Sequence, residues 1–340
     1  MKTSKTLTRV LAWSILVSGA LAGCSFCMPG SSYEAVPPPL SVEEEASRDH
    51  LRTHVYMLAK EIGERNLQHY DGLERARDYV AEQFRLAGYV PSMQSFVYHG
   101  ESFQNVEAIL LGHGSPRESV VVGAHYDSVE GSPGANDNAS GVATLLEVAR
   151  SLVGRPLPIT VRFVAFTNEE PPYFNAGEGM GSVEYAKALD DPAKDVRAML
   201  SLETVGFYSD VPGSQHYPPF VGIFYPDRGN FIAFVGNVQS RGIVRKAVGA
   251  FRAAATLPSE GATLPAFIPG VAWSDHRSFW EFGVPAAMVT DTAPFRDAHY
   301  HMATDSPERL DYERMARLVT GLGEVVRALA SNGPHPDSVR

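Results

Sequence analysis

Histidine and carboxylate side chains follow several apolar runs of the 340-residue chain. In chain order they are His125, Asp127, Asp137, Glu169, Glu170, Glu203 and His301. Imidazole nitrogens and carboxylate oxygens are the ligands that zinc and similar divalent ions bind in proteins. A pair of ions also needs one carboxylate that bridges them, and such a pair activates water for hydrolysis. The residue types therefore predict a two-metal hydrolytic site.

The first two of these residues end the apolar run at residues 120–124. His125 and Asp127 are two positions apart, and side chains at that spacing on a strand point to the same side. Asp127 is therefore expected to accept a hydrogen bond from the second ring nitrogen of His125 and to hold its tautomer. A single histidine at a strand end is more often structural, so this pair alone leaves that alternative open.

Asp137 lies in a loop of glycines and short side chains, residues 134–141, that leads into an apolar helix. A carboxylate in such a loop can approach two cations without steric obstruction. Asp137 or Asn138 could instead cap the helix. Both interpretations can hold for neighbouring residues.

Two adjacent carboxylates, Glu169 and Glu170, follow the apolar run at residues 163–166. They repel each other unless cations or protons compensate. If Glu170 binds a metal ion, Glu169 is left free as a general base. The alternative is a solvated acidic loop.

Glu203 ends a further apolar run, and a short histidine-containing segment lies beyond the last strand that we expect. In that segment the spacing does not decide whether His299 or His301 would bind a metal ion. Tyr300 between them could donate its phenol to a developing oxyanion, or it could be a packed aromatic residue.

Strands and helices alternate along the chain. Strands are expected at residues 95–98, 105–111, 119–124, 159–166, 198–202 and 286–289, and helices around 51–62 and 73–86 and at 140–152, 181–189 and 311–330. This order predicts an α/β fold, a three-layer α/β/α sandwich around a mixed, largely parallel sheet. In such sheets functional residues collect beyond the carboxyl ends of the strands, where four of the acidic or imidazole clusters fall.

The N-terminus has the pattern of an export signal. Lys2, Lys5 and Arg9 precede an uncharged stretch at residues 10–23 that is too short to span a bilayer. Its end, Leu21-Ala22-Gly23-Cys24, resembles the bacterial lipoprotein signal, in which the cysteine is lipidated; the alternative is an ordinary secretory signal. We expect a signal peptide at 1–23, a linker at 24–41, a catalytic domain at 42–331 and a flexible tail at 332–340. The protein is thus expected in the bacterial cell envelope, anchored to the membrane through Cys24.

The charge balance excludes one class of partner. The chain has 29 basic and 39 acidic residues, and removal of residues 1–23 would leave 26 basic residues and a formal charge of −13. Such a surface does not suit nucleic acid. Cys27 is the only cysteine besides Cys24, so no disulfide framework is available to the domain. The sequence does not indicate the oligomeric state.

From about residue 51 to residue 330 the chain resembles the M28-type zinc aminopeptidases, which are related to glutamate carboxypeptidases and animal glutaminyl cyclases. The motifs that carry the resemblance are His125-Tyr126-Asp127, residues 134–141, Asn168-Glu169-Glu170, Gly181-Ser182, Tyr185-Ala186, Ser274-Asp275-His276, and Tyr300-His301 with Asp305.

The resemblance implies an exopeptidase fold, two zinc ions and activity on the N-termini of peptides or small proteins. It implies that His125 and Glu203 hold one zinc, that Glu170 and His301 hold the other, and that Asp137 bridges them. Glu169 would be the general base, and the peptide bond from Asp137 to Asn138 would be cis. Glu203 stands at a position that is commonly aspartate in the family, and the ligand set also admits cobalt or manganese.

Three alternatives remain at this point. A related single-zinc site performs glutaminyl cyclisation. Carboxypeptidase action would need an arginine that grips a terminal carboxylate, for which Arg277 and Arg296 are candidates. A non-catalytic, lipid-anchored binding protein could keep the fold, although such proteins usually lose ligands and none is missing here. The segments 217–231 and 257–273 are expected to form walls of the substrate pocket.

Overall fold

One mixed sheet runs through the part of the chain that the computed structural model describes, residues 27–114, 117–174 and 177–331. Its eight strands in these ranges lie in the order β1-β2-β4-β3-β5-β8-β6-β7. Their bounds are β1 Ser92–Tyr98, β2 Glu101–Leu110, β3 Ser119–His125, β4 Thr160–Phe166, β5 Val196–Glu203, β6 Ile232–Gly236, β7 Ser259–Thr263 and β8 Ala286–Thr290. The expected signal peptide, Cys24 and tail at 332–340 lie outside the described residues. Within them, no helix has both the length and the apolar character needed to cross a membrane.

The middle of the sheet is parallel. β4, β3, β5 and β8 pair in parallel, as do β6 and β7, whereas β1 with β2, β2 with β4 and β6 with β8 are antiparallel. Every residue of β3 and β5 is buried. Continuous burial is expected of parallel strands that are covered on both faces, and it explains their unbroken apolar runs.

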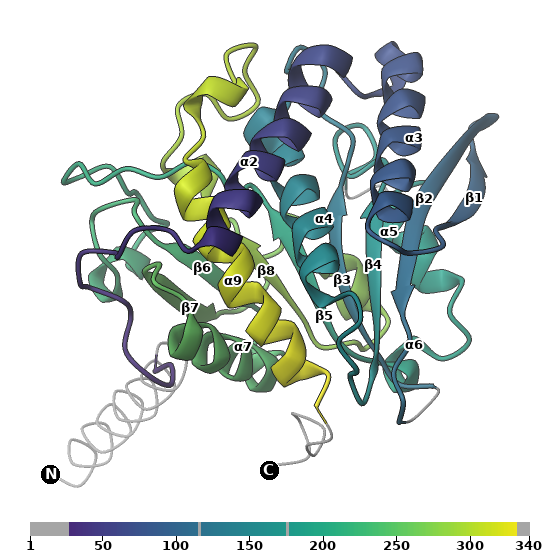
Figure 1. Ribbon diagram of the computed structural model, residues 1–340. Helices are drawn as coiled ribbons and strands as arrows, with labels where there is room; N and C mark the ends of the chain where they lie inside the picture. Colours follow the sequence, from purple (N-terminus) through teal and green to yellow (C-terminus); the bar gives the residue numbers. More distant parts are fainter. Residues whose placement is uncertain (1–26, 115–116, 175–176, 332–340) are drawn as a thin grey trace, which may run out of the picture.

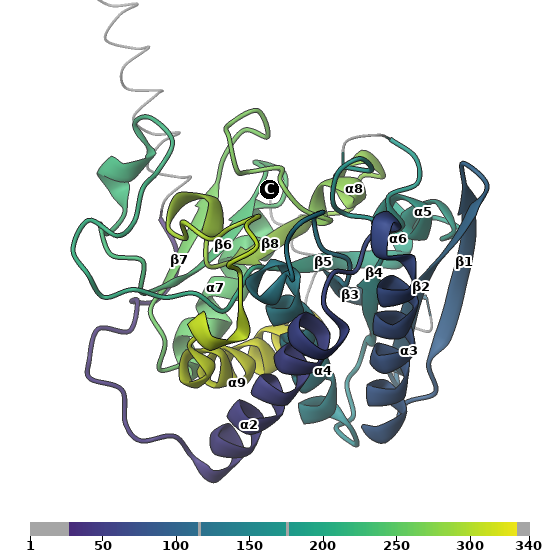
Figure 2. The ribbon, with the colours of Figure 1, turned by 90° about the horizontal axis from the view of Figure 1, so that it is seen from above.

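Helices cover the sheet on both faces (Figures 1 and 2). Their bounds are α2 Val42–Tyr56, α3 Tyr70–Leu86, α4 Gly141–Leu152, α5 Gly181–Lys187, α6 Pro192–Asp195, α7 Arg241–Ala254, α8 His276–Glu281 and α9 Tyr312–Leu329. α2, α3, α4, α7 and α9 form the thick layer in front of the sheet in Figure 1, and α5 and α8 pack on the opposite face. The predicted three-layer α/β/α sandwich is confirmed.

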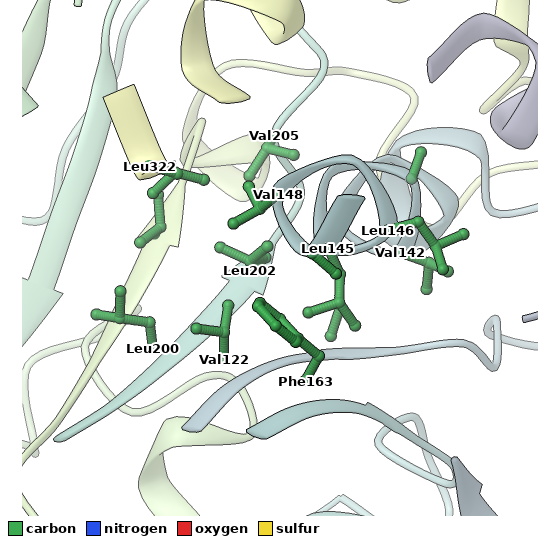
Figure 3. Close-up of a cluster of buried hydrophobic side chains, with 14 of the residues drawn as sticks. Val122, Val142, Leu145, Leu146, Val148, Phe163, Leu200, Leu202, Val205 and Leu322 are labelled. Atoms are coloured by element: carbon green, nitrogen blue, oxygen red, sulfur yellow. The ribbon is translucent and has the colours of Figure 1, made fainter. Parts of the chain in front are cut away.

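The larger hydrophobic core lies between this thick helical layer and the sheet. Leu145 of α4 is fully buried among residues of three strands, including Val122, Phe163 and Leu200 (Figure 3). Side chains alternate between the two faces of a strand. The residues of β3 and β5 that do not enter this core, such as Val121 and Met199, pack against α5 and α8 in a second cluster. His125 and Glu203 share that second face.

Five of these helices and strands were not predicted from the sequence, namely α6, β6, α7, β7 and α8. β6 and β7 have only five residues each, and β7 (Ser-Glu-Gly-Ala-Thr) has no apolar run that would mark a strand. α8 has six residues, too few for a helical period to stand out. α7 buries Ile243, Val244, Ala247, Val248 and Phe251 at regular helical spacing, so its pattern was present in the sequence.

The described part of the expected linker is held against the domain. Residues 27–41 contain neither helix nor strand. Met28 packs against the core, and Arg252 of α7 donates hydrogen bonds to the carbonyls of Pro29 and Gly30 at 3.3 and 3.2 Å. Further along, Arg317 of α9 donates to the carbonyl of Pro38 at 2.5 Å. From Met28 onward the segment is therefore part of the folded surface.

Candidate metal centre

The candidate ligands meet at the carboxyl ends of the central strands. His125 is the last residue of β3 and Glu203 is the last residue of β5. Glu170 follows the end of β4, and His301 follows β8. Because β3, β4, β5 and β8 are parallel neighbours, their ends lie at one edge of the sheet. The sheet order thus brings together residues that are up to 176 positions apart.

Two groups of three possible ligands share Asp137. One consists of His125, Asp137 and Glu203, the other of Asp137, Glu170 and His301, and within each group the ligand atoms lie within 4.8 Å of one another. His125 Nε2 is 3.3 Å from Asp137 Oδ1 and 3.2 Å from Glu203 Oε2. His301 Nε2 is 3.1 Å from Asp137 Oδ2 and 3.4 Å from Glu170 Oε2. The two carboxylate oxygens of Asp137 therefore face different groups, which is the arrangement of a bridging ligand.

The hydrogen bonding of these side chains fits bound cations. Four buried atoms at the centre form no hydrogen bond within the described ranges of the chain: His125 Nε2, Asp137 Oδ1, Glu170 Oε1 and His301 Nε2. A buried polar atom without a partner costs about 1 to 3 kcal/mol. Several such atoms at one point indicate a missing common partner, and imidazole nitrogens with carboxylate oxygens are a donor set for zinc.

The imidazoles and carboxylates of the centre perturb one another. Burial opposes ionisation of Asp137, but the adjacent imidazoles of His125 and His301 hold the pKa of Asp137 below its usual range. Burial lowers the pKa of His125, but the charges of Glu203 and Glu169 outweigh it and raise that pKa well above its ordinary value. A cation in place of protons relieves both conflicts.

The paired carboxylates after β4 are also perturbed. Burial, followed by the nearby charge of Asp137, raises the pKa of Glu170 well above its ordinary value. Burial likewise raises the pKa of Glu169, with Glu203 and Asp275 adding to it. Glu170 is only 3% exposed and Glu169 only 6%, so neither residue is solvated. This excludes the alternative of a solvated acidic loop.

Asp127 orients the neighbouring loop as well as the first histidine. Its Oδ1 lies 3.4 Å from His125 Nδ1, on the side of the ring away from the centre, but the two atoms do not form the hydrogen bond that we expected. It also accepts the backbone N–H groups of Glu169 and Glu170 at 3.2 and 3.0 Å. One buried carboxylate thus contacts the last residue of β3 and positions the acidic pair after β4.

The loop that carries Asp137 is fixed by its neighbours. The carboxylate of Asp305 accepts the backbone N–H groups of Asn136 and Asp137 at 2.9 and 3.1 Å. Asn138 Oδ1 accepts the N–H groups of Gly141 at the start of α4 and of Thr204, both at 3.1 Å. Asn138 thus satisfies backbone N–H groups beside the start of α4, while the carboxylate of Asp137 faces the two ligand groups. The Asp137–Asn138 peptide is cis, as the resemblance implies.

Glu169 and Tyr300 lie beside the ligand groups. In the described residues Glu169 belongs to neither group, and its Oε2 is 3.9 Å from His125 Nε2. Tyr300 stacks on the ring of His301 with centroids 3.9 Å apart, and it lines the cavity that opens at Glu203. Both are thus placed to act on a molecule held at the centre.

The open choice between two histidines is resolved by their contacts. His299 belongs to neither ligand group in the described residues, and its Nδ1 lies 2.6 Å from Thr304 Oγ1. His301 Nε2 instead lies close to Asp137 and Glu170, the other two members of the second group. The structure therefore favours His301.

Neither arginine considered for a carboxypeptidase lies at the centre. Arg296 is committed to the carbonyls of Gly229 and Phe231, at 3.0 and 2.9 Å, and to Gln215. Arg277 is on the surface of α8 beside Glu281, at 3.7 Å. No arginine of the described ranges lines the cavity next to the ligand groups.

Two supporting contacts were not found by sequence reasoning. Arg65 is fully buried and donates to five backbone carbonyls, those of Leu58, Gly63, Tyr126, Pro133 and Gly134, at 2.7–3.0 Å. It ties the segment before α3 to the loop that leads to Asp137. Ser274 Oγ donates to Glu203 Oε2 at 2.8 Å, which orients that carboxylate. Arg65 belongs to no motif, and the motif that contains Ser274 does not indicate its partner, so only the fold could reveal these two contacts.

A cavity extends from the centre over β8, β6 and β7. Its residues include Glu203 and Tyr300 at the metal end, Ala233 and Thr290 on the sheet, and residues of the two segments 217–231 and 257–273 that we expected as pocket walls. That expectation is confirmed. The lining is mostly apolar and aromatic, as in sites that bind small molecules or side chains.

The chain is similar to proteins of one family. The sequence profile of peptidase family M28 matches residues 105–326. The uncharacterized Escherichia coli protein YfbL is 39% identical over 292 residues, which are 83% of this chain and 88% of that protein. Leucine aminopeptidase 1 of Fusarium vanettenii is 28% identical over 276 residues, 74% of this chain and 63% of its own length.

Solved structures show the same fold at low sequence identity. A zinc aminopeptidase from Bacillus subtilis superimposes with a TM-score of 0.66 at 17% identity, over 85% of this chain and 97% of that one. A glutaminyl cyclase from Fimbriiglobus ruber gives a TM-score of 0.60 at 20% identity, over 87% and 98%.

Proposed function

Because the chain belongs to peptidase family M28, we propose that this peptidase is a zinc aminopeptidase that releases the first residue of a peptide. The observation that carries the proposal is the pair of three-ligand groups that share Asp137. Two adjacent cation sites suit a two-metal hydrolase better than a single-zinc cyclase. The leucine aminopeptidases and the zinc aminopeptidase among the similar proteins support it. Cobalt or manganese would fit the same donors.

His125, Glu203, Glu170 and His301 would hold two zinc ions with Asp137 between them. When bound, such ions polarise the scissile carbonyl and lower the pKa of a water molecule. Glu169 takes a proton from the attacking water and passes it to the leaving amine. It suits this role because it stands beside both groups without belonging to either.

Tyr300 supplies a hydrogen bond to the reacting carbonyl. Burial raises the pKa of its phenol far above the ordinary value, so the side chain keeps its proton. It donates a hydrogen bond to the developing oxyanion. The buried carboxylates near it also attract the protonated α-amine of a substrate. This acidic end of the cavity favours substrates with a free N-terminus.

The decisive experiment compares the two adjacent glutamates. Glu169→Gln should keep the metal content of the wild type and lose about 10² to 10⁴-fold in kcat on leucine p-nitroanilide. Glu170→Gln should lose bound metal as well as activity, since it removes a ligand. Elemental analysis beside turnover separates the two, and equal metal loss in both variants would contradict the assignment.

Substrate blocking and chelation test the reaction class. Wild-type turnover should disappear with a chelator and return with added zinc, and N-acetylleucine p-nitroanilide should be inert. Cyclisation of an N-terminal glutamine peptide without any hydrolysis of free N-termini would instead contradict the proposal.

We also propose that the protein is exported and anchored in the cell envelope through lipidated Cys24. The support is the sequence pattern Leu21-Ala22-Gly23-Cys24 after the uncharged stretch. Cys24→Ala should move the protein from the membrane fraction to the soluble fraction. An unchanged distribution would contradict lipid anchoring.

A further inference from the structure

Glu203 begins a row of paired residues that crosses the sheet to its edge. It pairs with Thr290 of β8, which pairs with Ala233 of β6. Ala233 in turn pairs with Glu260 of the edge strand β7. Figure 2 shows these four strands side by side. Residues paired directly across strands point to the same face of a sheet, so Glu260 faces the side on which Glu203 enters the metal centre.

The row forms the floor of the cavity. Glu203, Thr290, Ala233 and Glu260 all line it. The two residues between the glutamates are small, so the floor is a trough with a carboxylate at each end. Three strand spacings of about 4.8 Å make the trough about 14 Å long. That length accommodates the backbone of a first residue at the metal end and a long side chain beyond it.

Aromatic rings wall the trough near Glu260. Tyr217 and Tyr225 stack on each other, with centroids 5.7 Å apart and an angle of 20° between the rings. Their hydroxyls donate to the carbonyls of Pro226 and Gly261, at 2.6 and 2.9 Å. The phenols are therefore engaged with the backbone, and the aromatic rings line the cavity. Such walls accept an alkyl stem and attract a cation.

The carboxylate at this end is poorly compensated. Burial raises the pKa of Glu260; the charge of Arg252 opposes this rise, and the charge of Glu34 adds to it. Arg252 forms an ion pair with Glu260, but its Nη2 is 3.6 Å from Glu260 Oε2, which is longer than a hydrogen bond. Arg252 instead donates to the carbonyl of Ser259 at 2.7 Å. A second cation that donates a hydrogen bond would therefore stabilise the Glu260 carboxylate.

We propose that Glu260 determines specificity and that the trough takes the side chain of an N-terminal lysine or arginine. This inference rests on the proposed aminopeptidase function. A lysine side chain extends roughly 6 Å from its α-carbon, as follows from bonds of about 1.5 Å. Its stem packs on the aromatic walls while its ammonium group, or the guanidinium of arginine, donates to Glu260. A purely apolar trough would favour a large neutral side chain instead.

The test compares two substrates that differ in the terminal charge. Lysine and norleucine p-nitroanilide share a straight four-carbon stem, and only lysine carries the ammonium group. The wild type should favour lysine in kcat/KM by about tenfold or more, the range expected for a charge-assisted hydrogen bond. Glu260→Gln should reduce kcat/KM for lysine by about tenfold and leave that for norleucine within about twofold, which also shows that the variant is folded.

Glu34→Gln is the matched control. Glu34 is exposed on the segment before α2, and its charge acts on Glu260 although it does not line the cavity. The loss of its charge should leave the preference between the two substrates unchanged.

Two results would overturn this inference and leave the proposed aminopeptidase function intact. One is equal hydrolysis of lysine and norleucine substrates by the wild type, and the other is a lysine preference that survives in Glu260→Gln. If the zinc-loaded wild type hydrolyses no amino-acid p-nitroanilide, the aminopeptidase function fails and this inference fails with it.

Discussion

His276 is a buried histidine outside both ligand groups, and it should make stability depend on pH. Its side chain is fully buried, with Nε2 2.8 Å from the carbonyl of Val271 and the edge of the Trp280 ring against it. Burial lowers the pKa of His276 from 6.5 to about 4. Between these values the unfolded chain binds a proton that the folded protein does not. The stabilisation from neutral His276 is therefore complete above pH 6.5 and is lost as the pH falls toward 4.

The size of the effect follows from the two pKa values. The difference between 6.5 and about 4 corresponds to about 3.4 kcal/mol in full. Between pH 7.5 and pH 5, about 2 kcal/mol of unfolding free energy should be lost through this one side chain. That is a large fraction of the stability of an ordinary domain.

Urea unfolding of the wild type and of His276→Gln measures the effect. Glutamine does not titrate and keeps an N–H group for the carbonyl of Val271. Both proteins are measured with a chelator, so that metal binding does not contribute. Between pH 7.5 and pH 5, the free energy of unfolding of the wild type should fall by about 2 kcal/mol more than that of the variant. Equal losses would refute the reasoning that His276 stays neutral in the folded protein.

Two further substitutions test the framework of the site. Arg65→Met leaves five backbone carbonyls without their donor and should lower the free energy of unfolding by about 3 to 5 kcal/mol in urea titrations; a loss under 1 kcal/mol would contradict its role. Leu145→Ala opens a cavity between α4 and the sheet (Figure 3) and should cost about 2 to 5 kcal/mol. Its kcat per folded molecule should stay unchanged, and a large fall in kcat would show that this core also sets the site geometry.

The central sheet could be predicted from sequence because its strands are buried on both faces. Runs such as residues 120–124 are apolar throughout, and a ligand at the end of each run then falls at one edge of a parallel sheet. The same reasoning predicted that Glu203 and Glu170 lie at that edge. The edge strand β7 gave no such signal, because it contains Glu260 and Gly261 in five residues and is recognised only by its pairing with β6.

The details of the site could not be predicted from sequence, because they depend on contacts between distant segments. The two-residue spacing of His299 and His301 fits either as a ligand, and only their contacts in the fold distinguish them. Arg65 has no motif, since its acceptors are backbone carbonyls of any sequence. Glu260 gains its place only from the pairing of four strands.

Metal stoichiometry tests the central claim most directly. Zinc-loaded wild-type protein should contain two ions per chain by elemental analysis, and anomalous diffraction should show two peaks that share Asp137 as a ligand, with His125 and His301 on opposite sides. A single ion at saturation, or two ions bound away from Asp137, would contradict the account.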